Sequence, residues 1–252
     1  MRVSAIIITK NAGATLRRCL DSLQWTDQIV VVDSGSADDT VAIARALGAE
    51  VHQTADWPGY GPQKNRALER ASGDWVLSID ADEWLTSAAR EEIRRVIATA
   101  DAKPAYALPR RSSFCGRDMK HSGWWPDYVV RLFRRADARF SDDLAHERLI
   151  VAGAVGRLRE PLMHEAIADL DQMLGKMNAY STASALMLAR RGRRATLAGA
   201  VLHGVFAFVR TYFLRLGVLD GREGFMLAVA NAEGSYYRYV KLMMLAGKNA
   251  PQ

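Results

Sequence analysis

The first eighty residues alternate short apolar runs with helical patterns, and this alternation constrains the fold most strongly. Four runs rich in β-branched residues are predicted strands: residues 3–9, 28–33, 50–54 and 75–80. Three segments with helical spacing lie between them: about 14–23, 38–47 and 62–71. Strands joined by helices form right-handed crossovers in a parallel sheet. The sequence therefore predicts an α/β fold with a mostly parallel sheet covered by helices on both faces.

The remainder of the chain changes character twice. Residues 105–155 are predicted to form short strands and loops rich in Arg, Trp, Gly and Pro, without a core helix. From Asp169 the pattern is helical almost to the end, with breaks at RRGRR and at GVLDGREG. We expect one domain over residues 1–165 and a helical region over residues 166–252.

Composition limits the class of protein. Hydrophobic residues make up 49% and charged residues 25% of the 252 residues, as in an ordinary globular protein. Cys19 and Cys115 lack disulfide or zinc-ligand spacing, which favours a reducing compartment. The first strand begins at Val3, which leaves no room for a signal peptide, so a cytoplasmic protein is expected. The net charge is +6, but aromatic residues do not interleave with the basic stretches, which argues against nucleic acid as a partner.

Three carboxylates follow the predicted strand at residues 75–80. The stretch VLSIDADEWL places Asp80, Asp82 and Glu83 within four positions. Like charges this close repel one another unless a cation lies among them or the turn is open to water. One interpretation is a solvated turn. The other is a site for a hard divalent cation such as Mg2+ or Mn2+, which prefers oxygen ligands.

Polar residues end three of the predicted strands. Thr9, Asp33 and Asp80 stand at the carboxyl ends of the first, second and fourth runs. Open parallel α/β sheets bind ligands beyond that edge, so these side chains are expected at a ligand site. The first strand is followed by TKNAGATL, which contains neither GxGxxG nor GxxxxGK[ST]. This disfavours a dinucleotide-dependent enzyme and a P-loop NTPase.

Several segments together resemble the inverting family 2 glycosyltransferases with a GT-A fold. They are SAIIITKNAGATLRRCLDSL, IVVVDSGSADDT, GYGPQKNRALERASGDWVLSIDADE and DLAHERL, in the family's order and approximate spacing. The resemblance covers residues 1 to about 165 and is closest to the branch of β-1,4-glucosyltransferases that act on the lipopolysaccharide inner core. The helical tail is similar to that branch more loosely, through GVLDGREGF. It implies a Rossmann-like, mostly parallel sheet with flanking helices and a helical C-terminal extension.

The resemblance implies a nucleotide-sugar site and a metal site. Residues that match the family's nucleotide pocket are Thr9, Lys10, Asn11, Asp33, Lys64, Arg66 and Asp80. Asp33 would contact the base and Asp80 the ribose, while Asp82 and His164 would hold Mg2+ or Mn2+. Lys64 and Arg66 could instead lie on a solvated helix face. His164 could equally be a hydrogen-bonded structural histidine.

A catalytic base is implied in the short segment AHERL. Glu147 is the predicted base, which would deprotonate the acceptor hydroxyl. Asp142 and Asp143 are rivals because many relatives write this motif as Glu-Asp, whereas here His146 precedes Glu147. Glu147 beside Arg148 could otherwise be an ordinary surface ion pair.

Two further features concern the acceptor. Trp124 and Trp125 are predicted to form an acceptor-site loop, because indole rings stack on sugar faces and donate an N–H; two core residues are the alternative. The apolar segment from residue 197 is interrupted by His203, Arg210 and Arg215, so it is not predicted to span a membrane. Four arginines precede it, and we call them the basic cluster: Arg190, Arg191, Arg193 and Arg194. For the helical region over residues 166–252, peripheral contact with an anionic membrane, packing on the catalytic domain over residues 1–165, and contact of the arginines with acceptor phosphates are all open.

The residues and the resemblance together predict a metal-dependent hexosyltransferase. The favoured donor is UDP-glucose, and the acceptor is expected to be a lipid-linked, lipopolysaccharide-like glycan. The enzyme is expected at the inner face of the cytoplasmic membrane. One alternative is an inactive nucleotide-sugar-binding protein at the membrane. The other is a sugar nucleotidyltransferase, which is disfavoured because no triphosphate loop rich in Gly and Lys follows the first strand.

Overall fold

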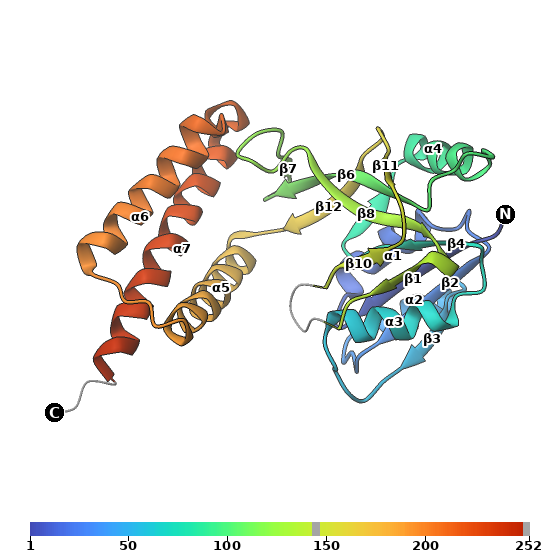
Figure 1. Ribbon diagram of the computed structural model, residues 1–252, viewed down its shortest axis with the longest axis horizontal. Coiled ribbons are helices and arrows are strands. Elements are labelled where there is room, and N and C mark those ends of the chain that lie inside the picture. Colours follow the sequence, from blue (N-terminus) through green and yellow to red (C-terminus); the bar gives the residue numbers. More distant parts are fainter. Residues whose placement is uncertain (143–146, 249–252) are drawn as a thin grey trace. The chain divides into compact units, whose positions relative to one another are not determined.

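The protein folds into two compact units, seen in the ribbon view of a computed structural model that describes residues 1–142 and 147–248 (Figure 1). The first unit comprises Met1–Arg110 and Asp127–His164, and the second comprises Arg111–Pro126 and Glu165–Gln252. The domain boundary expected from the sequence, at residue 165, instead assigned Arg111–Pro126 to the first domain.

The first unit contains the predicted parallel sheet. Neighbouring strands run in the order β3-β2-β1-β4, and each pair is parallel. In this register Thr9 of β1 lies beside Asp33 of β2, so the two polar strand ends meet. The four strands are β1 (Val3–Thr9), β2 (Gln28–Asp33), β3 (Glu50–Gln53) and β4 (Trp75–Ser78). The predicted α/β fold is confirmed.

Beyond β4 the sheet continues as β8-β6-β12-β5. Strand β8 is antiparallel to β4 and β6, and β5 is antiparallel to β12. This part brings residues that are distant in sequence to the carboxyl end of β4. Its elements and the smaller strands are β5 (Glu83–Leu85), β6 (Ala105–Phe114), β7 (Arg117–Asp118), β8 (Asp127–Arg134), η1 (Arg135–Asp137), β9 (Ala138–Phe140), β10 (Leu149–Val151), β11 (Val155–Arg157) and β12 (Leu162–Ile167).

Helices cover both faces of the sheet. Alternate residues of β1 point to opposite faces: Ile7 packs in the core with Leu16 and Leu20 of α1, and Ile6 packs with Ala67 and Leu68 of α3. Both faces are therefore apolar, as the continuous runs require. The helices are α1 (Gly13–Asp21), α2 (Thr40–Ala46), α3 (Tyr60–Arg70) and α4 (Ser87–Ile97). The sequence analysis did not predict α4.

The second unit is helical. Its core joins Phe114 and Met119 to Met173, Leu227 and Ala230, so residues from both chain segments share one cluster. Its elements are α5 (Leu170–Arg190), α6 (Leu197–Val209), the π turn η2 (Arg210–Leu214), the 3-10 turn η3 (Gly217–Asp220) and α7 (Gly221–Lys248).

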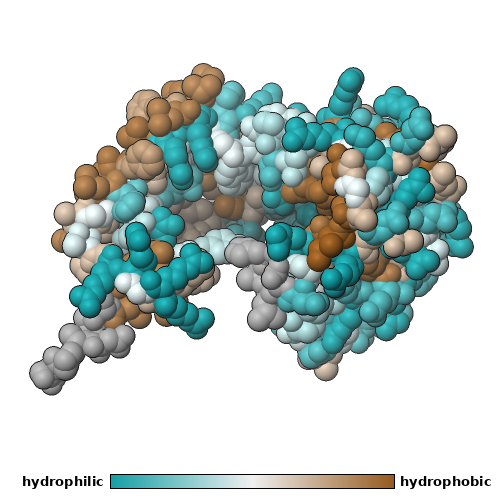
Figure 2. Space-filling view, in the orientation of Figure 1, coloured by the Kyte–Doolittle hydropathy of each residue, from teal (hydrophilic) through white to brown (hydrophobic). Residues whose placement is uncertain are grey.

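Large apolar side chains are exposed along α6 and η2, and Figure 2 shows them gathered over this part of the second unit. Among the described residues, Leu197–Leu214 is the one stretch long and apolar enough to cross a membrane, and 22% of it is buried. The basic cluster immediately before α6 is exposed. We call the following side chains the α6 face: Leu197, Val201, Leu202, Val205, Phe206, Phe213 and Leu214.

Candidate active site

Asp33 anchors the loop that follows β2. Its buried carboxylate accepts hydrogen bonds from the Thr9 hydroxyl at 2.9 Å, from the backbone N–H groups of Gly35 at 3.1 Å and Ser36 at 2.9 Å, and from the Ser36 hydroxyl. These donors occupy the four acceptor positions of a carboxylate. Contact of Asp33 with a nucleotide base stays a prediction, and in this structure the residue positions the loop.

Asn11 connects the end of β1 to the same loop. It has φ of 52°, its N–H donates to the Ser36 hydroxyl at 2.8 Å, and its side-chain oxygen accepts from the N–H of Ala37 at 2.9 Å. Asn tolerates this left-handed conformation better than most residues. Asn11 thus shapes the edge, whereas Lys10 is exposed beside it.

An aromatic pocket opens next to the end of β1. It has a volume of about 380 Å³ and is lined by Ile8, Thr9, Lys10, Trp57 and Tyr60. The two aromatic rings meet edge to face with centroids 5.0 Å apart, and they are 43% and 47% exposed. Exposed aromatic rings can stack on the planar base of a nucleotide, and a neighbouring lysine can pair with its phosphates. The sequence analysis missed both rings, although WPGY, aromatics in a Pro-Gly loop before a helix, was a signal.

Arg66 and Gln63 of α3 hold the loop that carries Trp57. Arg66 forms a bidentate ion pair with Asp56, with both N–O distances 2.8 Å. The buried Gln63 amide donates to the hydroxyl of Thr54 at 2.9 Å. The predicted nucleotide-facing role of Arg66 stays a prediction, because its guanidinium is engaged with Asp56 here.

Two of the three carboxylates after β4, Asp80 and Glu83, are arranged around one guanidinium. Arg131 of β8 is buried, and its Nη2 contacts Asp80 and lies 2.7 Å from Oε1 of Glu83. Glu83 is fully buried, and its other oxygen accepts the backbone N–H of Asp80 at 3.0 Å. Arg110 lies 3.5 Å from Glu83 and pairs with Asp127. The Arg131 guanidinium is therefore the cation that offsets the repulsion between Asp80 and Glu83.

The same arrangement shifts the pKa values of these groups in opposite directions. Burial alone would raise the pKa of Asp80, but the charges of Arg131 and Lys64 outweigh it and hold that pKa well below its usual value. Burial, with the neighbouring charge of Asp80, raises the pKa of Glu83 although Arg131 opposes it. Asp80 is therefore ionised at neutral pH.

Lys64 joins the β4 end to the predicted base. Its side chain is 6% exposed, and Nζ lies 3.2 Å from Oδ1 of Asp80 and 2.8 Å from Oε1 of Glu147. Lys64 is therefore not on a solvated helix face. The contact brings Asp80 and Glu147, which are 67 positions apart, into one cluster at the ligand edge. Asp142 is exposed, and Asp143 and His146 lie outside the described residues.

Asp82 and His164 are neighbours. Nε2 of His164 lies 3.6 Å from Oδ2 of Asp82, because the antiparallel register of β12 and β5 pairs His164 with Glu83. The side chains are 16% exposed for His164 and 36% for Asp82. In the described part of the chain, no group of three or more His, Cys, Asp or Glu could hold a metal. A metal at this pair stays a prediction, and phosphate oxygens and water would have to supply its other ligands.

The two predicted acceptor tryptophans lie in the second unit. Trp124 packs edge to face on Phe114 with ring centroids 6.1 Å apart, and the Arg111 guanidinium lies 4.8 Å from the Trp125 ring centre. Both indoles are partly exposed. Their contact with an acceptor stays a prediction.

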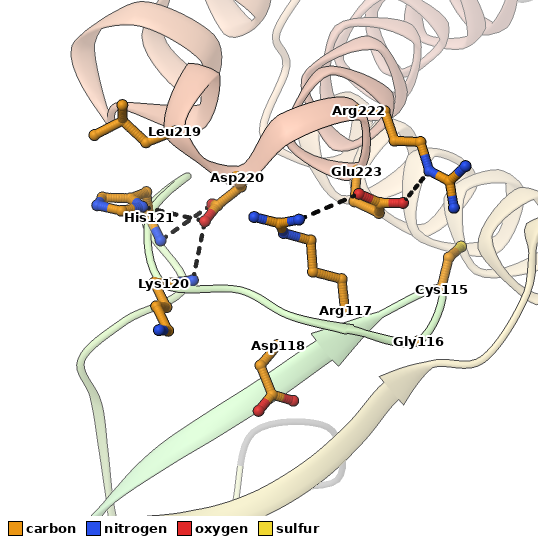
Figure 3. A pocket seen from close by; sticks show the side chains of 10 residues that line it. All are labelled: Cys115, Gly116, Arg117, Asp118, Lys120, His121, Leu219, Asp220, Arg222 and Glu223. Atoms are coloured by element: carbon orange, nitrogen blue, oxygen red, sulfur yellow. Dashed lines mark hydrogen bonds and ion pairs between the residues drawn. The ribbon is translucent and has the colours of Figure 1, made fainter.

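The segment GVLDGREG holds the loop before Trp124 through Asp220. Figure 3 shows Asp220 directed at the loop before Trp124, where the buried carboxylate accepts the backbone N–H groups of Lys120 and His121, both at 3.1 Å. The Ser122 hydroxyl donates to it at 2.9 Å. A Cβ on Gly224 would lie 2.0 Å from the backbone oxygen of Gly217, so a glycine at position 224 allows the turn to close. The pocket in Figure 3, about 710 Å³, carries both acidic and basic side chains.

Comparison with known proteins identifies the family. Residues 4–158 match the family described as Glycosyl transferase family 2. An uncharacterized glycosyltransferase of Rickettsia conorii is 32% identical, over 96% of this chain and 89% of its own length. A lipopolysaccharide core biosynthesis glycosyltransferase, LpsC of Rhizobium meliloti, is also 32% identical, over 95% of this chain and 91% of its own.

The solved structure of S. aureus TarS residues 1–349 in complex with UDP is similar in fold. It has a TM-score of 0.51 and 16% sequence identity, over 99% of this chain and 92% of that chain. The structure of the same protein in complex with UDP-GlcNAc has the same TM-score, over 98% of this chain and 92% of that chain. The sheet with its flanking helices and the C-terminal helices agree with a GT-A-type fold. The chain therefore belongs to glycosyl transferase family 2 and is a glycosyltransferase.

Proposed function

We propose that this enzyme transfers glucose from UDP-glucose to a sugar hydroxyl of a lipopolysaccharide-like acceptor, with inversion at the transferred sugar. The observation that carries the proposal is the Lys64 bridge, which holds Asp80 and Glu147 in one cluster at the carboxyl edge of the sheet. The likeness to the LpsC protein over most of both chains supports the choice of acceptor. The family assignment argues against a sugar nucleotidyltransferase.

On the donor side, the nucleotide base would occupy the aromatic pocket, against Trp57 and Tyr60. Thr9 and Lys10 line this pocket, and the Lys10 ammonium can approach a phosphate. Asp80 would accept hydrogen bonds from the ribose hydroxyls, because it is ionised and 34% exposed. Asp33 would act by holding the neighbouring loop.

A divalent cation would be held by Asp82 and His164. An oxygen and an imidazole nitrogen suit Mn2+, and Mg2+ usually takes one or two carboxylates with substrate phosphates. When bound, the ion would supply electrostatic stabilisation of the negative charge on the departing diphosphate. The partial exposure of both side chains leaves them accessible to it.

The reaction is a single displacement at the anomeric carbon. Glu147 would take the proton of the acceptor hydroxyl as its oxygen forms a bond to that carbon. The bond from the anomeric carbon to the diphosphate oxygen breaks, and its electron pair leaves with UDP. Lys64, 2.8 Å from Oε1 of Glu147, would fix the direction of the carboxylate.

We propose that the acceptor is bound at the cytoplasmic side of a membrane. Trp124 and Trp125 would stack on its sugar rings. The α6 face would lie in the interface of the bilayer, while the basic cluster beside it would attract anionic headgroups.

Binding and turnover assays of two variants test the proposal. Calorimetry with UDP-glucose and Mn2+ should detect binding to the wild type and to Glu147→Gln within about twofold, whereas Asp82→Ala should bind about tenfold more weakly or worse. With a lipopolysaccharide core oligosaccharide as acceptor, kcat of Glu147→Gln should fall by about 10²- to 10⁴-fold.

Asp142→Asn removes an exposed carboxylate from the same segment and should retain activity, whereas loss of turnover in this variant would assign the base to Asp142. Near-wild-type turnover in Glu147→Gln with loss of turnover in Asp143→Asn would assign the base to Asp143. The absence of binding for any nucleotide diphosphate sugar would refute the donor site.

A further inference from the structure

The second unit contains a cavity of about 470 Å³ that the transfer chemistry does not use. It lies among α5, η2, α7 and the loop before Trp125, and all of its lining residues belong to this unit. Four of them are basic: Lys176, Arg210, Arg215 and Arg238. Among the described residues that line it there is no acidic side chain.

The four basic side chains lack a compensating charge. Within residues 1–142 and 147–248, none of them forms an ion pair with a carboxylate. Lys176 donates to the backbone oxygen of Ala166 at 2.6 Å. Arg238 forms one long hydrogen bond, 3.4 Å, to the Ser235 hydroxyl, and its guanidinium lies 4.9 Å from the centre of the Tyr239 ring. Nε of Arg238 is buried and has no hydrogen-bond partner. Four like charges around one cavity, with a buried unsatisfied donor, favour an anionic ligand.

The other walls are apolar. Met173 and Leu227 are buried at the cavity, and Met177 and Trp124 line it as well. Methionine side chains adapt their shape to irregular apolar ligands. A ligand that satisfies both walls therefore carries an anionic group and an apolar part.

The arginines and the number of cations favour a phosphate. A guanidinium forms two parallel hydrogen bonds to a carboxylate or a phosphate, and three of the four cations are arginines. A phosphate, with a charge of about −1.5 to −2, offsets several cations better than a carboxylate does. Arg210 and Arg215 are exposed, whereas Lys176 and Arg238 are half-buried, so the cavity can admit a group from solvent and hold it at depth.

We propose that this cavity binds the phosphoryl group of an amphiphile, with the apolar part against the methionines. If the proposed function is correct, the amphiphile is the phosphorylated lipid-linked acceptor; that identification rests on the proposed function, and the binding does not. The phosphoryl group could also come from a membrane phospholipid or from free phosphate, and the experiments below distinguish these sources.

Calorimetric titrations with soluble probes test the binding directly. The probes are dihexanoylphosphatidic acid below its micelle concentration, glycerol 3-phosphate as the headgroup alone, and dihexanoylphosphatidylcholine as an amphiphile with a capped phosphate. Wild-type protein should bind phosphatidic acid at least about tenfold more tightly than either of the others. The double variant Lys176→Gln/Arg238→Gln should lose at least about tenfold in affinity.

The matched control is Lys120→Gln/Arg222→Gln, which removes two exposed charges of the same unit outside the cavity and outside the basic cluster. It should bind within about twofold of wild type. If the half-buried double variant unfolds by circular dichroism, Arg210→Gln, at an exposed position, replaces it. Equal losses in cavity and control variants would overturn the proposal, as would equal affinity for glycerol 3-phosphate or phosphatidylcholine.

Transfer kinetics separate the acceptor from a membrane lipid. The cavity variant should raise KM for a phosphorylated acceptor by about tenfold with little change in kcat, and should leave KM for the dephosphorylated acceptor unchanged. An unchanged KM for both would overturn the identification with the acceptor. Because the titrations contain no nucleotide sugar, a failure of UDP-glucose binding would refute the proposed function and leave this site standing.

Discussion

Arg131 is the residue on which the arrangement around Asp80 depends. Its Nη2 contacts both Asp80 and Glu83, and its own Nε is buried without a hydrogen-bond partner. A buried charge pair that loses one partner leaves an uncompensated charge, which costs more than the pair itself contributes. Arg131 therefore offsets the negative charge at both carboxylates, and this fixes Asp80 at the edge of the sheet.

Replacing Arg131 should destabilise the fold in a pH-dependent way. Arg131→Met is expected to lower the free energy of unfolding at pH 7 by about 3–5 kcal/mol, as for other broken buried pairs. Without the guanidinium, the pKa of Glu83, already raised by burial, rises further, and Asp80 loses a charge that lowers its pKa. The native state then binds more protons than the unfolded state, so the loss should shrink as the pH falls.

Urea unfolding at pH 7 and pH 5 measures this effect. Arg135→Met, which removes an exposed arginine next to the same strand, should change the unfolding free energy by no more than about 0.5 kcal/mol at either pH. A deficit of Arg131→Met that grows on acidification would contradict the assignment of charges.

Individual residues were predictable where they stand at a strand end. Asp80, Asp82 and Asp33 follow apolar runs, so the sequence alone predicted them at the ligand edge. Arg131 was not predicted, because it reaches Asp80 through the antiparallel pairing of β4 with β8, a contact between distant parts of the chain. Whether Asp33 touches a base depends on hydrogen bonds that no sequence pattern specifies.

At the scale of elements, helix α3 connects Asp80, which follows β4, to Glu147. It begins in a glycine-rich turn and presents Lys64 toward Glu147. Gly61 makes this approach possible, since a Cβ there would lie 1.8 Å from the backbone oxygen of Ser141 and 3.4 Å from Cβ of Glu147. No side chain fits between the helix and this segment.

Gly61→Ala should therefore damage the site through an element rather than through a catalytic group. The clash is expected to cost about 1–3 kcal/mol and to move the Ser141 segment away from α3. The displaced Glu147 should lower kcat by about tenfold or more, because small misplacements of a catalytic group are costly. Gly175→Ala, in α5 where a Cβ meets nothing within 4 Å, should retain kcat and be slightly stabilising. Thermal unfolding and steady-state kinetics measure both variants; a wild-type kcat for Gly61→Ala would contradict the role of the close approach.

Elements with local signals were predicted well. Strands β1 to β4 and helices α1 to α3 follow from apolar runs and helical spacing within the first eighty residues. Helix α4 was missed although Thr86 caps it and Ala89, Ile93 and Ile97 share its buried face. The order β8-β6-β12-β5 could not be predicted, because the strands carry no local sign of their partners and the pairs β4–β8, β6–β12 and β12–β5 join segments that are far apart in the chain.

At the scale of the whole molecule, the chain divides its tasks between two units. The first carries the aromatic pocket, the Lys64 bridge and the Asp82–His164 pair. The second carries the α6 face and the basic cluster. Sequence analysis left open whether the tail packs on the protein or contacts a membrane. The exposure of the α6 face favours the membrane, because a soluble monomer rarely exposes a large contiguous apolar patch.

Removing apolar side chains from the α6 face should weaken binding to anionic vesicles. Burial of a Leu or Phe side chain is worth about 1.5–3 kcal/mol, so Leu202→Ser/Phe206→Ser should reduce the partition coefficient on phosphatidylglycerol vesicles by at least about tenfold. The matched variant Leu186→Ser/Met187→Ser removes exposed apolar side chains of α5 and should bind like wild type.

Arg193→Gln/Arg194→Gln should weaken binding to the vesicles at low salt and differ little from wild type at high salt, because salt screens the attraction to the headgroups. Cosedimentation measures all four proteins. If the α6 and α5 variants bound equally well, the α6 face would not be the surface that meets the membrane, and its exposed side chains would need a protein partner.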